Sequence, residues 1–103
     1  MVRKELEDLG VGTNRTFIAI YHKGGKRYKR NNQTYMDVCF KLVVDEQSAT
    51  LVTDHIWVNF KMKDVLKLNI KNGNIVTFTG TITSYGDGET GVNKGKIINV
   101  RRG

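Results

Sequence analysis

The stretch YMDVCFKLVV, residues 35–44, alternates apolar and polar side chains more regularly than any other part of the chain. A period of two places successive side chains on opposite faces of a β-strand. We therefore predict a strand with one buried face, formed by Met36, Val38, Phe40, Leu42 and Val44. The opposite face, which carries Tyr35, Asp37, Cys39, Lys41 and Val43, is expected to meet solvent or a ligand.

Four further stretches have the β-branched and aromatic composition of strands: residues 16–22, 51–60, 75–85 and 96–102. In residues 51–60, the alternation turns Ile56, Val58 and Phe60 inward and leaves Trp57 on the other face. In residues 75–85 the inward positions are Val76, Phe78, Gly80 and Ile82. A glycine inside such a strand predicts a bulge or a sharp bend.

Between the third and fourth strands, residues 61–70 have the apolar spacing of a short amphipathic helix. Residues 2–9 show a weaker helical spacing, which predicts an N-terminal turn that is stable only when it packs on the body of the protein. A chain of 103 residues supports one core. We expect an N-terminal segment at 1–14 and one domain at 15–103.

Three strands, a helix and two strands match the order of the OB-fold, a five-stranded, partly open barrel. The segments DHIWVNF (54–60) and LNIKNGNIVTFTG (68–80) resemble OB-fold nucleic-acid-binding proteins, in which a helix ends in a glycine turn before a Val-x-Phe-x-Gly strand. The resemblance spans about residues 15–102, and this region is similar to small OB-fold proteins of bacteria, phages and plasmids. It implies an all-β, five-stranded OB-fold barrel that binds single-stranded nucleic acid.

The formal net charge of +7 favours polyanionic partners, nucleic acid first and an anionic membrane surface second. The single cysteine cannot form an internal disulfide, and the first residues carry acids where a secretory signal needs an apolar core. No apolar run reaches the roughly 20 residues of a membrane span. We expect a cytoplasmic protein.

Residues 22–33 are the strongest candidate for a phosphate-binding element, because they carry five cations and no acid. The alternative is a solvated hairpin tip, which we consider less favoured because an aromatic residue lies among the cations. We predict a hairpin loop beside the ligand groove, with contacts from Lys23, Lys26, Arg27, Tyr28, Lys29 and Arg30.

Base contacts are expected on the outward sheet face, where Trp57 lies between His55 and Asn59 on one strand. Tyr35 and Lys41 would lie beside them on the next strand, and Lys94 and Lys96 would face the groove from the last connection. Trp57 could instead cover an open end of the barrel, and both alternatives stay open. Tyr21 and Tyr85 are weaker candidates, since an aromatic near a strand end more often packs at the rim.

No nucleophile lies at a recognisable spacing from a base, and the histidines and the cysteine are isolated from one another. We therefore expect no catalysis, no metal and no cofactor. The predicted function is binding of single-stranded nucleic acid, DNA favoured, without sequence specificity. The alternatives are an RNA-binding protein, or a protein-interaction or assembly module of a mobile-element or translation complex. The oligomeric state stays open.

Overall fold

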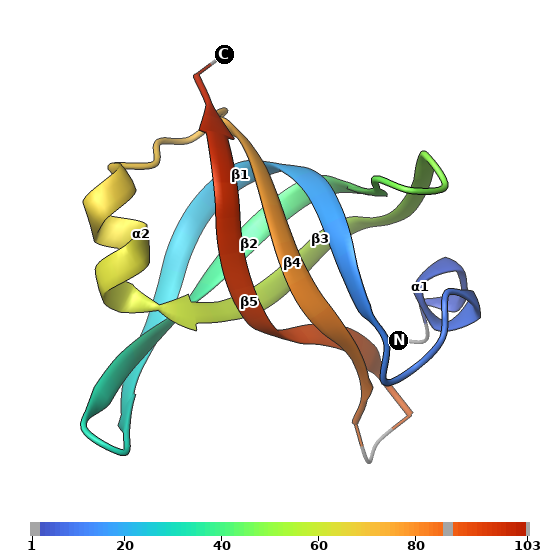
Figure 1. The fold of residues 1–103 in the computed structure, drawn as a ribbon, viewed down its shortest axis with the longest axis horizontal. Helices are drawn as coiled ribbons and strands as arrows, with labels where there is room; N and C mark the ends of the chain where they lie inside the picture. The colour runs from blue at the N-terminus through green and yellow to red at the C-terminus, as the bar shows by residue number, and fades with distance from the viewer. Residues whose placement is uncertain (1–2, 86–87, 103) are drawn as a thin grey trace.

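The protein is described by a computed structural model over residues 3–85 and 88–102. Five antiparallel strands form one sheet in the order β3-β2-β1-β4-β5 (Figure 1). The predicted five strands and the short helix between the third and fourth are confirmed. The elements are α1 (Lys4–Asp8), β1 (Asn14–Arg30), β2 (Gln33–Asp45), β3 (Thr50–Lys61), α2 (Met62–Leu68), β4 (Ile75–Ser84) and β5 (Thr90–Arg101).

The first two strands form a long hairpin, and the basic segment belongs to it as strand rather than as loop. β1 pairs with β2 as far as Arg30 opposite Gln33. The turn is made by Asn31 and Asn32, whose φ angles of 50° and 64° suit a tight two-residue hairpin turn. The prediction of a loop over residues 22–33 is therefore wrong. Gly24 and Gly25, a pair typical of turns, instead lie at an irregularity in the pairing, between Gly24 and Arg27. We call residues 23–35 the arm.

The predicted inward face of β2 holds for its first half only. Met36, Val38 and Phe40 are buried, but Leu42 is 52% exposed and Val43 is fully buried. Leu42 has a φ of 51°, and the pairing with β1 is irregular at this point. The bulge shifts the alternation by one residue, which a sequence period cannot show. The expectation that Leu42 faces the core is therefore wrong.

Strand β4 has the predicted inward face: Val76, Phe78, Gly80 and Ile82 are all buried. The expected irregularity at Gly80 is present, because Thr79 and Thr81 pair with residues three apart on β5, Lys96 and Asn93. A Cβ at Gly80 would collide with the Val92 side chain. β5 begins at Thr90, six residues before the predicted start of the last strand at residue 96; Gly86 and Asp87 lie outside the described residues.

The core is built around four phenylalanines from four strands. Phe40 and Phe78 stack with centroids 4.6 Å apart, and Phe17 and Phe60 pack on Phe78. Helix α1 adds Leu6, which is fully buried, and α2 adds Val65. The sheet curls around this core, and β3 and β5 are its two unpaired edges (Figure 1). None of the helices among the described residues has the length and apolar character needed to cross a bilayer.

Candidate nucleic-acid interface

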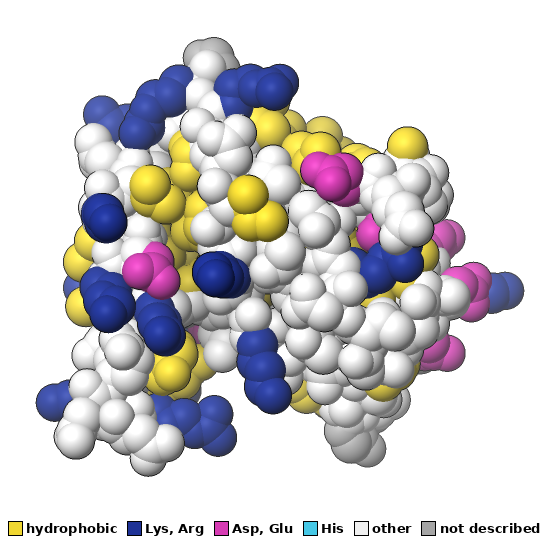
Figure 2. Space-filling view, in the orientation of Figure 1, with side chains coloured by type: hydrophobic (Ala, Val, Ile, Leu, Met, Phe, Trp, Pro, Cys, Tyr) yellow, Lys and Arg dark blue, Asp and Glu magenta, His cyan; other side chains and the backbone are white. Residues whose placement is uncertain are grey.

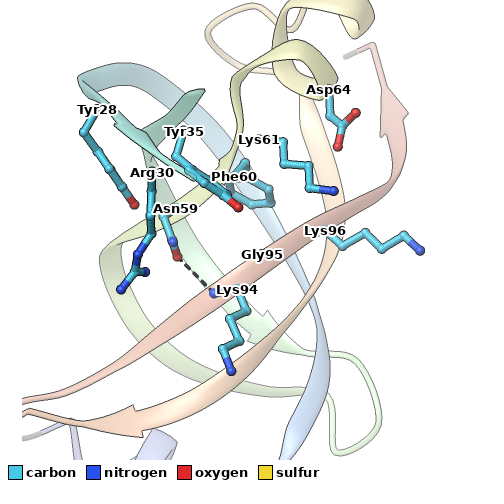
Figure 3. Close-up of a pocket in the computed structure, with 10 residues that line it drawn as sticks. All are labelled: Tyr28, Arg30, Tyr35, Asn59, Phe60, Lys61, Asp64, Lys94, Gly95 and Lys96. Carbon is cyan, nitrogen blue, oxygen red and sulfur yellow. Dashed lines mark hydrogen bonds between the residues drawn. The ribbon is translucent and has the colours of Figure 1, made fainter. Parts of the chain in front are cut away.

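A groove of about 470 Å³ lies between the arm and strand β5 (Figure 3). On one side, Tyr28 and Tyr35 stack with ring centroids 5.8 Å apart and an interplanar angle of 21°. On the other side, Lys94 and Lys96 project from β5. Between them lie Asn59, Phe60 and Lys61 of β3, together with Arg30 and Asp64.

The floor of this groove is the place where the two sheet edges meet. The backbone N–H of Lys94 donates to Oδ1 of Asn59 at 2.9 Å, which ties β5 to β3. Gly95 follows, and a Cβ there would lie 2.6 Å from Cε1 of Phe60 and 2.8 Å from Cγ1 of Val58. Only glycine lets β5 pass so closely over β3.

A second hollow of about 310 Å³ continues the groove toward the β4–β5 connection. Tyr28 and Asn59 line both hollows, so the two are adjacent. We call the combined feature the arm groove. The second hollow adds Asp37, Trp57, Tyr85, Val92 and Asn93 to its lining.

Trp57 is 43% exposed, and its ring lines the second hollow. A Cβ at Gly25 would lie 2.5 Å from Cζ3 of its ring, so the indole rests on the arm where glycine leaves room. The Nζ atom of Lys23 lies 6.0 Å from the ring centroid, within the range of a cation–π contact. The arm therefore positions the ring while a large part of it stays accessible.

The arm groove is rich in cations. Arg30, Lys61, Lys94 and Lys96 line it, and all four are exposed. Figure 2 shows Lys and Arg side chains on both sides of a notch beside the protruding arm. Such a lining attracts a polyanion, and the aromatic rings along the same path offer flat apolar surfaces.

Several predicted site residues lie elsewhere. Arg27 lines a different hollow of about 320 Å³, between the arm and the α2 residues Val65 and Leu66. Lys26 and Lys29 are exposed on the arm, and neither lines the arm groove.

His55 and Lys41 face each other in the β2–β3 register, two residues beyond Trp57 and outside the groove lining. His55 bonds through Nδ1 to Oδ1 of Asp54 at 3.0 Å, and this bond lowers the pKa of the Asp54 carboxyl. Asn59 does line the groove, but its Oδ1 is used by the Lys94 backbone.

Sequence reasoning missed four polar groove residues, Lys61, Asp64, Asp37 and Asn93. Lys61 is two residues after Asn59, so the strand period could have placed it on the same face. Asp37 lies on the face of β2 that the alternation assigned to solvent or a ligand. Asn93 comes into the groove through the β5 bulge opposite Gly80; the glycine predicts the bulge but not which β5 residue it turns toward the groove.

The comparisons with known proteins give this chain no relative: no family model matches it, and no curated protein matches it. Among the described residues there is also no group of three or more His, Cys, Asp or Glu side chains placed to hold a metal ion. The arm groove is therefore the feature from which a function is best argued.

Proposed function

We propose that the protein is an OB-fold module that binds single-stranded nucleic acid, DNA first, in the arm groove. The observation that carries the proposal is the arm groove itself, two adjacent hollows lined by three aromatic rings, those of Tyr28, Tyr35 and Trp57, and four cations. Cations neutralise phosphates and release counterions, while rings stack bases of any sequence. Together these are the two components of single-strand binding.

The position of the arm groove supports the OB-fold part of the proposal. OB-folds bind oligonucleotides on the face of strands 2 and 3, between the first hairpin connection and the last. Here Asp37 of β2 and Trp57 of β3 lie between Tyr28 of the arm and Tyr85 of the β4–β5 connection. The open edge between β3 and β5 agrees with a barrel that is only partly closed.

A single strand fits this lining better than a duplex does. In a duplex the bases are stacked on one another, so Trp57 and the tyrosines would have no base face to contact. In a single strand, stacking on an aromatic side chain is worth about 1–3 kcal/mol per base.

The direct test uses the fluorescence of Trp57, the only tryptophan in the chain. Titrating a mixed-sequence 15-nucleotide DNA at low salt should quench the emission, and duplex DNA of the same sequence should quench it far less. Matched RNA competes in a third arm and separates the two polymers. Absence of binding to either single strand at low salt would refute the proposal.

A variant pair locates the binding. Trp57→Leu should weaken binding of a labelled oligonucleotide by about 10-fold or more, since one stacked base is lost. Leu51→Ala removes a similarly exposed apolar side chain, 51% against 43%, from the same strand outside the arm groove. It should bind as the wild type does. Equal loss in both variants would place the ligand elsewhere.

A further inference from the structure

A carboxylate lies in the Trp57 end of the arm groove, where a path for phosphates alone would not need one. Asp37 is half-buried on β2, opposite Asn59 in the register, and lines the hollow with Tyr28, Trp57 and Tyr85. Within the part of the chain that the structure describes, its carboxylate has neither an ion-pair partner nor a hydrogen-bond donor. A carboxylate held in a hollow in this way is open to N–H donors of a ligand.

The four DNA bases differ in what they offer to a carboxylate. Guanine presents two adjacent donors, N1–H and the N2 amino group, beside its O6 acceptor. Cytosine and adenine each present one amino group, and thymine has a single N–H between two carbonyl oxygens. An ionised carboxylate accepts only, so it can take two parallel bonds from guanine and is repelled by the thymine carbonyls.

Asn59 supplies a complementary group beside Asp37. Because Oδ1 of Asn59 accepts the Lys94 backbone N–H, the Nδ2 end of the amide is the one left to donate. A donor next to a two-oxygen acceptor matches the order of groups on the guanine edge, O6 then N1–H and N2–H. The rings of Tyr28, Trp57 and Tyr85 in the same hollow offer stacking surfaces for the base plane.

The Asp37 carboxylate affects the titration of the neighbouring Tyr85 hydroxyl. Burial and then the negative charge of Asp37 raise the pKa of the Tyr85 hydroxyl above its usual range. The hydroxyl therefore stays protonated at neutral pH, and the only negative charge among the seven residues of this hollow is the Asp37 carboxylate.

We infer that the arm groove has a base preference. At its Trp57 end it selects guanine, because Asp37 and Asn59 form hydrogen bonds with the Watson–Crick edge of that base. The inference rests on the proposed function and adds a base preference to it. One correctly read base is worth about tenfold in affinity.

The test compares four 10-nucleotide DNAs that do not self-pair: d(TG)5, d(TI)5, d(TC)5 and d(T)10. Inosine differs from guanosine only by the missing N2 amino group. We expect d(TG)5 to bind about 10-fold tighter than d(T)10, with d(TI)5 and d(TC)5 between them. Equal binding of all four would overturn the inference and leave the proposed function intact, whereas binding of none would refute both.

A matched pair of variants tests whether Asp37 is the residue that recognises guanine. Asp37→Asn removes the charge but keeps the shape, so the preference for d(TG)5 should fall below about 2-fold, while d(T)10 binds as tightly or more tightly. Asp64→Asn removes the other carboxylate of the arm groove, and it should keep the full preference. A preference that survives Asp37→Asn, or that is lost equally in Asp64→Asn, would overturn the assignment.

Discussion

Removing two lysines from β5 should change the salt dependence of binding, and removing two from α2 should not. Lys94 and Lys96 line the arm groove, whereas Lys63 and Lys67 are exposed and line neither of its hollows. The variants Lys94→Gln/Lys96→Gln and Lys63→Gln/Lys67→Gln each lower the net charge from +7 to +5. They therefore differ in where the charge is lost, not in how much.

The magnitude follows from the number of groove cations. For a single strand, the slope of log affinity against log salt is about −0.7 for each phosphate neutralised. Four cations line the groove, so their contribution to the slope is about −2.8, and the β5 variant should retain about −1.4. Between 50 and 200 mM salt, these slopes weaken binding about 50-fold and about 7-fold. Further phosphate contacts from Lys26 or Lys29 would steepen all slopes alike.

The assay is fluorescence anisotropy of a labelled oligo(dT) over a salt series, with the thermal midpoint of each variant measured as a folding control. The β5 variant should lose about 1.4 from the slope, and the α2 variant should match the wild type. If both variants flatten the slope equally, the attraction is a diffuse effect of net charge. The groove would then not position phosphates.

Two other changes test how the groove is built, and a third tests an ion pair outside it. Gly25→Val would place a Cβ 2.5 Å from Cζ3 of Trp57, so the free protein should show a shifted Trp57 emission and about 10-fold weaker oligonucleotide binding. Gly95→Ala would place a Cβ 2.6 Å from Phe60, and overpacking should lower the free energy of unfolding by about 1–3 kcal/mol in urea titrations. Asp45→Asn tests the buried ion pair: the hydrogen bond from Arg15 lowers the pKa of Asp45 from 3.8 to about 2, which at about 1.4 kcal/mol per pKa unit corresponds to about 2 kcal/mol. Because the folded pKa lies below the unfolded one, this stability is present above about pH 4 and is lost as the pH falls toward 2, so wild-type and variant unfolding curves should converge there. A constant difference at all pH values would contradict the ion-pair account.

The order of strands and helix along the chain, and much of the core, could be predicted because they depend on local patterns. A buried strand face must repeat every two residues, and this rule located Val38, Phe60 and Phe78 correctly. The helix between β3 and β4 could be predicted for the same reason, since its apolar spacing changes from two to about 3.6 residues.

The errors arose where pairing between distant segments overrides the local pattern. The bulge at Leu42 depends on how β2 meets β1, and it reverses the alternation for the rest of the strand. The Gly24–Gly25 pair lies within the strand, where the absence of side chains makes room for Met36 and Trp57. The sequence of one strand contains no information on what lies across from it.

The candidate site was predicted in part, for the same reason. Tyr28, Arg30, Tyr35, Trp57, Asn59, Lys94 and Lys96 were predicted from residue type and face, and the fold brings them to one groove. Arg27 and Lys29 belong to the same charge run, yet they alternate with Tyr28 and Arg30 along the extended arm and so lie on its other side. Lys26 lies in the irregular stretch between Gly24 and Arg27. A basic run in a loop could converge on one ligand, whereas the same run in a strand divides between two surfaces.

The arm groove crosses the only edge at which neighbouring described strands are not joined by a ladder. There, the bond from Lys94 to Asn59 and the packing of Gly95 on Phe60 hold β5 against β3. A nucleic-acid strand bound across this edge would contact cations on both sides, Lys61 on β3 and Lys96 on β5. It would add contacts between the two strands where the sheet has fewest. Ligand should therefore stabilise the fold, by about 2.7 kcal/mol when its concentration is 100 times the Kd. The same open edge explains why glycine is needed at position 95. Side-chain packing holds β5 against β3 there, and a larger residue would push the two strands apart and widen the floor of the groove.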